Sequence, residues 1–159
     1  MKDKQFKLSH LFLGTIILLV VQATLFFFIP AVNTNEGLII LFGIIGAVMN
    51  IYVAIEAIEE VRGRLQTLAF LSLIVLGFII FFSFEYWFLI LVEPNSFPTL
   101  SPDFLTLFLH STMVFVFNPL YLPATVVAKI LFLTNTLGSL GLVLFILQNI
   151  GQLKPKKLS

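Results

Sequence analysis

The chain has 159 residues, of which 59% are hydrophobic and only 11% are charged, and its formal net charge is +1. A water-soluble domain needs more polar residues to cover its surface, so this composition predicts an integral membrane protein whose partner is the lipid bilayer. The small net charge argues against binding to nucleic acid. The absence of Cys excludes disulfides and thiolate metal sites.

No catalytic motif stands out in the sequence. The two histidines, His10 and His110, lie far apart, and there is no HExxH, no phosphate-binding glycine loop and no Ser-His-Asp spacing. We therefore expect no enzyme, no cofactor and no metal site.

Four apolar stretches are long enough to cross a bilayer, which takes roughly 20 residues. They cover residues 11–29, 37–55, 68–92 and 124–150. The first has the basic start and apolar core of a signal peptide, but its core is long and no small-x-small cleavage site precedes Pro30. We expect it to remain as a membrane helix.

A fifth apolar stretch, residues 104–117, is too short to cross comfortably. Its start is typical of a helix, with Ser101 as the expected N-cap, Pro102 at the first position and Asp103 in the first turn. A re-entrant helix that dips into the membrane and returns fits this pattern, and a helix lying on the surface is the alternative. The sequence thus predicts an all-α membrane protein with four transmembrane helices plus a short re-entrant helix between helices three and four.

The basic residues give the orientation. Eight of the nine lie before helix one, between helices two and three, or after helix four: Lys2, Lys4, Lys7, Arg62, Arg64, Lys154, Lys156 and Lys157. The positive-inside rule places these segments, and both termini, in the cytoplasm, and we expect the plasma (inner) membrane. Tyr86, Trp87 and Tyr121 then suit the outer aromatic belt.

Residues 68–150 read as a helix, an outer loop, a short descending helix, a proline-containing linker and a final helix. The informative residues are Leu91-Val92-Glu93, Asp103-Phe104-Leu105, Ser111-Thr112-Met113-Val114-Phe115, Leu122-Pro123-Ala124-Thr125, Lys129, Gly138 and Gly141. In this order they resemble the pore domain of the tetrameric cation channel (potassium-channel) superfamily.

The resemblance implies a domain organisation and a function. Residues 1–64 would form two peripheral transmembrane helices, residues 65–153 the pore-domain-like unit, and residues 154–159 a cytoplasmic tail. Four copies would form a homotetrameric pore that conducts a monovalent cation passively. Gly138 would be a hinge in the inner helix.

The expected filter departs from the potassium pattern. Alignment back from Pro123 places Phe115-Val116-Phe117-Asn118-Pro119 on the family's Thr-Val-Gly-Tyr-Gly, so only Val116 matches. Phe117 and Pro119 are not expected to adopt the backbone conformations that the filter glycines provide. We therefore predict a filter and pore loop without potassium selectivity, formed by Val114, Phe115, Val116, Phe117, Asn118 and Pro119.

Several of these side chains allow two interpretations. Asn118 would form a ring facing the ion path, or would be a turn residue that satisfies its own backbone. Phe115 and Phe117 would form a hydrophobic constriction, or would pack into neighbouring helices.

Thr112, His110 and Glu85 are the expected support of the pore helix. Glu85 lies inside helix three and would pair with His110 behind the filter, because ionisable groups in membrane segments usually face protein or water. The alternatives are that Glu85 reaches the interface and that His110 is a hydrogen-bonded structural residue.

A stripe at helical spacing runs along the last helix: Asn135, Ser139, Leu142, Ile146 and Asn149. It would line the inner cavity, or would serve helix–helix packing. Lys129 would snorkel to the interface or pair with Glu93. Gly43-x-x-Gly46 predicts close helix contact, and Glu56 with its charged neighbours predicts a water-exposed helix end.

Two further functions remain open from the sequence. One is a small dimeric transporter that couples protons or substrate to Glu85 or Glu56, and the other is a non-conducting membrane helper protein with a channel fold. A distorted filter fits the helper as well as it fits a changed selectivity.

Overall fold

A computed structural model describes residues 36–60 and 64–150, together with six single positions between residues 13 and 24. Every regular element in these residues is a helix: α2 Glu36–Glu60, α3 Arg64–Val92, α4 Phe104–Phe115 and α5 Val126–Ile150. The six single positions are helical too, but the rest of the expected helix at 11–29 lies outside the described residues. The prediction of an all-α fold is confirmed for this part of the chain.

Three of the helices are long and apolar enough to cross a membrane, judged by length and composition. The apolar segments are Glu36–Glu56, Thr67–Val92 and Val126–Asn149. They begin and end within a few residues of the stretches expected from the sequence. The described part of the chain is therefore all-helical, and its three long apolar helices indicate an integral membrane protein.

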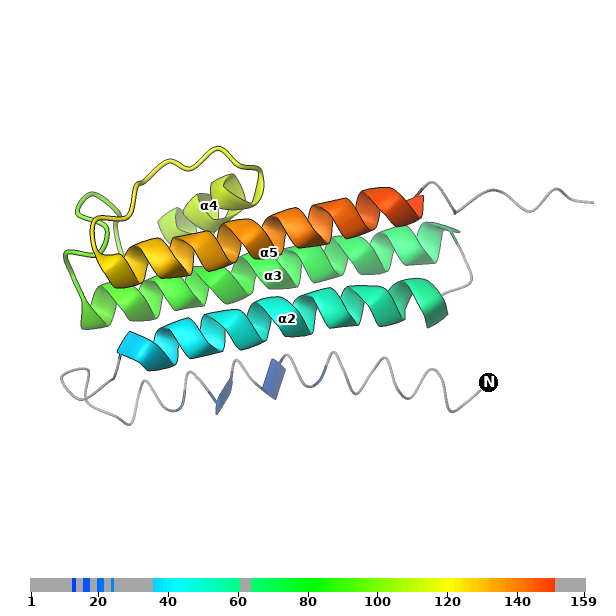
Figure 1. Ribbon diagram of the computed structural model, residues 1–159, viewed down its shortest axis with the longest axis horizontal. Coiled ribbons are helices and arrows are strands. Elements are labelled where there is room, and N and C mark those ends of the chain that lie inside the picture. Colours follow the sequence, from blue (N-terminus) through cyan, green and yellow to red (C-terminus); the bar gives the residue numbers. More distant parts are fainter. Residues whose placement is uncertain are drawn as a thin grey trace, which may run out of the picture.

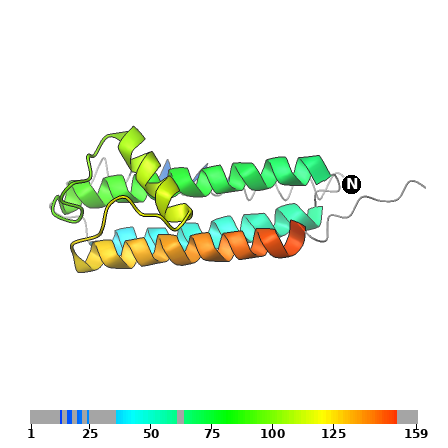
Figure 2. The same cartoon turned by 90° about the horizontal axis from the view of Figure 1, so that it is seen from above.

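The three long helices lie side by side, and α4 lies against one end of the bundle (Figure 1). α2 packs against both α3 and α5, whereas α4 packs against α3 and α5 near the end where α3 stops and α5 begins. We call this the loop end. After α4 the chain runs back to the loop end before α5 starts (Figure 2).

Side chains define the helix starts at the loop end. Asp103, and not Ser101, is the N-cap of α4, because its carboxylate accepts a hydrogen bond of 2.9 Å from the backbone N–H of Thr106. The same contact lowers the pKa of Asp103 to about 2. Thr125 precedes α5, where its Oγ1 accepts from the N–H of Ala128 and donates to Glu93 Oε2 at 2.6 Å.

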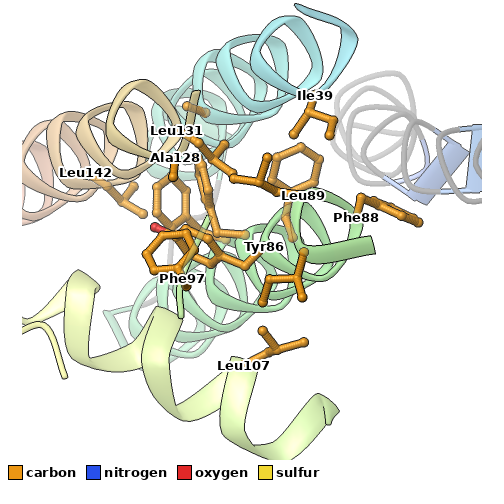
Figure 3. Packing of buried hydrophobic residues seen from close by; sticks show 14 of the residues in the cluster. Ile39, Tyr86, Phe88, Leu89, Phe97, Leu107, Ala128, Leu131 and Leu142 are labelled. Carbon is orange, nitrogen blue, oxygen red and sulfur yellow. The ribbon is translucent and has the colours of Figure 1, made fainter. Parts of the chain in front are cut away.

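The core consists of large side chains from α3 placed against small residues of α2 and α5. Phe78, Phe81 and Phe82 are completely buried. A Cβ at Gly46 would lie 2.1 Å from the Phe81 ring, and one at Gly138 would lie 2.9 Å from the Phe78 ring. Figure 3 shows how tightly the buried side chains fill the space between the helices. The close contact expected from the Gly43-x-x-Gly46 spacing is present.

This packing predicts that Gly46→Ala destabilises the fold by about 1–3 kcal/mol, because the added methyl overlaps the Phe81 ring. Gly77→Ala is the matched control, since its Cβ would meet only Asn50 Oδ1, at an ordinary 3.9 Å. Thermal unfolding in detergent compares the two variants. Equal melting temperatures would contradict the packing described for α2 and α3.

Candidate functional site

α4 is attached to the middle of α3. Ser111 Oγ donates a 3.0 Å hydrogen bond to the backbone carbonyl of Ile79, which also accepts from Ser83 Oγ. Ile79 is the thirteenth of the 26 residues of the apolar segment Thr67–Val92. The C-terminal half of α4 is therefore level with the centre of the longest apolar helix.

The C-terminus of α4 forms a Schellman cap. The N–H of Asn118 donates to the carbonyl of Met113 at 2.8 Å, and the N–H of Phe117 donates to the carbonyl of Val114 at 3.0 Å. Phe117 occupies the position that usually carries Gly, with φ of 60°. The cap thus holds Phe117 in the left-handed region, although a residue with a Cβ seldom adopts this conformation.

The segment from Val116 to Thr125, hereafter the return loop, is irregular and largely exposed in the single chain. Its most exposed apolar side chains are Leu122 (73%), Val116 (54%) and Leu120 (48%), and Phe117 follows at 47%. One backbone bond ties it to the turn after α3, from the N–H of Ala124 to the carbonyl of Ser96 at 2.8 Å. The exposed face of the loop therefore has no cover within the described residues.

The residues of the expected filter divide into two groups. Val114 is buried and Phe115 packs inward, with its ring 5.9 Å from that of Phe78. Phe117 and Asn118 point away from the core and are exposed. The packing interpretation therefore applies to Phe115, whereas Phe117 and Asn118 remain available to face a common axis.

His110 lies inside an aromatic cage, hereafter the His110 cage. Its ring is 4.8 Å from Tyr86, 5.3 Å from Phe97 and 5.6 Å from Tyr121, in edge-on arrangements. Neither ring nitrogen has a hydrogen-bond partner among the described residues, so the expected Glu85–His110 hydrogen bond is not formed. Glu85 is completely buried and does not reach the interface.

Tyr86 lies in the protein interior and not in an aromatic belt. Its hydroxyl accepts a 3.0 Å hydrogen bond from Asn135 Nδ2 on α5, and Ser139 Oγ donates to the Asn135 carbonyl at 2.8 Å. Asn135, Ser139 and Leu142 are completely buried within one chain. They cannot line a pore between copies in this packing, so helix packing accounts for this half of the stripe.

The other half of the stripe is partly buried. Ile146 packs against the core, and Asn149 donates to the carbonyl of Phe145 in its own helix. α5 runs unbroken through Gly138, which accommodates the Phe78 ring, so no hinge is visible there. Thr112, one of the expected supports, donates to the Phe108 carbonyl within α4.

Three charged residues, Glu93, Lys129 and Glu56, either differ from what the sequence predicted or decide between two interpretations of it. Glu93 accepts from Thr125 and forms no ion pair with Lys129, whose side chain is exposed, as expected for snorkelling. Glu56 is buried, and Tyr52 donates to its carboxylate at 2.9 Å, so the end of α2 is not simply solvated.

No group of three or more His, Cys, Asp or Glu side chains that could hold a metal occurs in the described part of the chain. Sequence reasoning missed Ile79, Ser96 and Phe97 as members of this region. Ile79 acts through its backbone, which carries no sequence signal. Ser96 and Phe97 lie in the stretch interpreted as an outer loop, for which no packing role was predicted.

Comparisons with protein-family models, with curated proteins and with solved structures find no match to this chain. The resemblance to tetrameric cation channels therefore remains a prediction from the sequence.

The strained cap predicts that Phe117→Gly is more stable than Phe117→Ala by roughly 1 kcal/mol. Both changes remove the ring, but only Gly removes the penalty of a Cβ in the left-handed region. Denaturant titration of the two variants in the same detergent measures the difference. A less stable Phe117→Gly would show that φ of this residue is not positive.

The buried Tyr86–Asn135 bond predicts that Tyr86→Phe destabilises the bundle by about 0.6–2 kcal/mol, because it leaves a buried amide without its acceptor. The double variant Tyr86→Phe/Asn135→Leu should lose less stability than the two single variants together. Strict additivity in this double-mutant cycle would contradict the bond.

Proposed function

We propose that this chain is a channel-like membrane subunit with the pore-domain architecture. In this proposal it has four transmembrane helices, counting residues 11–29, and α4 re-enters the bilayer from outside. Both termini lie in the cytoplasm, and the protein resides in the plasma membrane. Four copies surround one axis, along which a monovalent cation moves passively.

The observation that carries the proposal is the Ser111–Ile79 hydrogen bond. Ile79 lies 13 residues from Val92, or roughly 20 Å along the helix at about 1.5 Å per residue. The hydrocarbon core of a bilayer is about 30 Å thick, so a helix lying on its surface would not reach this level. Re-entry explains the contact, and it places the return loop at membrane depth.

The return loop supports assembly into an oligomer. Irregular backbone at membrane depth is tolerated only where other protein covers it or where it lines a water-filled cavity. Val116, Phe117 and Leu122 are exposed in the single chain, and further copies would supply the cover. A tetramer is the assembly that the resemblance to the channel superfamily implies, with each copy contributing one loop to the axis.

The Schellman cap differs from a potassium filter of stacked carbonyls. It ties the N–H groups of Phe117 and Asn118, two of the aligned filter positions, back to the last turn of α4. The exposed amide of Asn118 is the polar group that four copies would bring to the axis. A cation that passes this ring would keep more of its hydration shell than a cation inside a potassium filter does.

The exposed Phe117 ring favours a second candidate, the non-conducting helper protein with a channel fold. Four Phe117 rings at the axis would form an apolar seal that excludes water, because hydrophobic constrictions close by dewetting. No comparable observation favours the dimeric transporter, since Glu85 is completely buried.

Single-channel recording of the purified protein in planar bilayers, across K⁺, Na⁺ and Cl⁻ gradients, tests the proposal. We expect a cation current whose conductance or selectivity changes in Asn118→Ala. Asn95→Ala, in the exposed turn after α3, is the matched control and should leave the current unchanged.

Silence from a protein shown by native mass spectrometry to be a folded tetramer would favour the non-conducting candidate. A monomer or dimer in the same measurement would contradict both forms of the proposal.

A further inference from the structure

The His110 cage joins three segments that are separate in the sequence. Tyr86 belongs to α3, Phe97 to the turn after α3, and Tyr121 to the return loop. Their rings surround an imidazole that is completely buried. The cage is therefore one of the places where the return loop is held against the rest of the bundle, together with the Ala124–Ser96 and Thr125–Glu93 hydrogen bonds.

The two nitrogens of His110 are buried without hydrogen-bond partners in the described residues. Such orphaned groups are rare in folded proteins, and each requires an explanation. A hydrophobic residue of the same size would fill this space without desolvating two polar atoms. The imidazole therefore has a role other than filling space in the core.

Burial favours the neutral form of the imidazole. α3 contributes the Tyr86 ring to the cage, the turn contributes Phe97 and the return loop contributes Tyr121, and Glu85, which precedes Tyr86 in the chain, forms no hydrogen bond with either ring nitrogen. α5 reaches the cage through Asn135, which is uncharged and bonded to Tyr86. Burial lowers the pKa of His110 to about 4, because desolvation disfavours the imidazolium.

We propose that His110 is a proton-binding site that couples the pH to the opening of the return loop. A proton from water reaches a ring nitrogen when Tyr121 and the loop move off the cage. The resulting imidazolium does not return to the apolar cage easily, so the loop stays open. This inference does not depend on whether the protein conducts ions.

The direction of the pH dependence follows from linkage. The open state has the ordinary histidine pKa of about 6.5, and the closed state has the lower value, so the open state binds more protons in acid. The closed state is fully stable above about pH 6.5 and loses stability as the pH falls toward 4. The two values predict an opening equilibrium about tenfold larger at pH 5.5 than at pH 7.5.

Hydrogen–deuterium exchange of the full chain in nanodiscs measures this opening directly. Peptides covering residues 112–125 should exchange about tenfold faster at pH 5.5 than at pH 7.5, after correction for the intrinsic pH dependence of exchange. His110→Phe keeps an aromatic ring in the cage and should abolish this difference. His10→Phe, which changes the only other histidine of the chain, should preserve it.

Two outcomes would overturn the proposal. One is the same pH response in the wild type and in His110→Phe, and the other is a response that disappears in Glu85→Gln while His110 is present. Should His110→Phe fail to fold, His110→Gln, which does not titrate, replaces it in the same comparison.

Discussion

The attachment of α4 to the middle of α3 determines the path of the chain that follows α4. Once Ser111 bonds to the carbonyl of Ile79, the chain after α4 starts half-way along the apolar bundle and must return to the loop end within the ten residues of the return loop. These residues cannot form another helix of useful length there. The Schellman cap, the left-handed Phe117 and the two prolines are the local means by which this reversal is made.

The same attachment explains why many polar side chains are buried inside one chain. α4 covers the face of α3 that carries Tyr86, and α5 closes the other side through Asn135. Glu85, His110 and Ser139 are all completely buried. The side chains that remain exposed beyond the end of α4 are those of the return loop, Phe117 and Asn118 among them.

The helices were predictable from the sequence, because a span of apolar residues bounded by prolines and charges has few other solutions in a membrane. Their rotation was not predictable. Polar residues are few in α3, and in α5 they fall on several sides, as Thr134, Asn135 and Thr136 do, so no single polar face indicates which side turns inward. For this reason Tyr86 was assigned to an aromatic belt and the Asn135 stripe to a cavity, although both lie in the core.

The two caps of α4 could not be predicted from the sequence, because both depend on backbone geometry. Ser101 and Asp103 are both good N-cap residues, and only the position of the first turn decides between them. A phenylalanine with positive φ is uncommon, so Phe117 gave no sign of capping a helix. The glycines of α2 were more informative, because their spacing alone predicted the close approach that the Phe81 ring exploits.

Cysteine cross-linking tests the central claim, that the return loops of several copies meet at one axis. The chain has no Cys, so Asn118→Cys introduces a single thiol for a bifunctional thiol reagent in native membranes. Leu73→Cys, on the exposed surface of α3, provides the control. The account predicts covalent products up to the tetramer with Asn118→Cys and few or none with Leu73→Cys. Uncross-linked monomer from Asn118→Cys, with its thiol shown to be reactive, would contradict it.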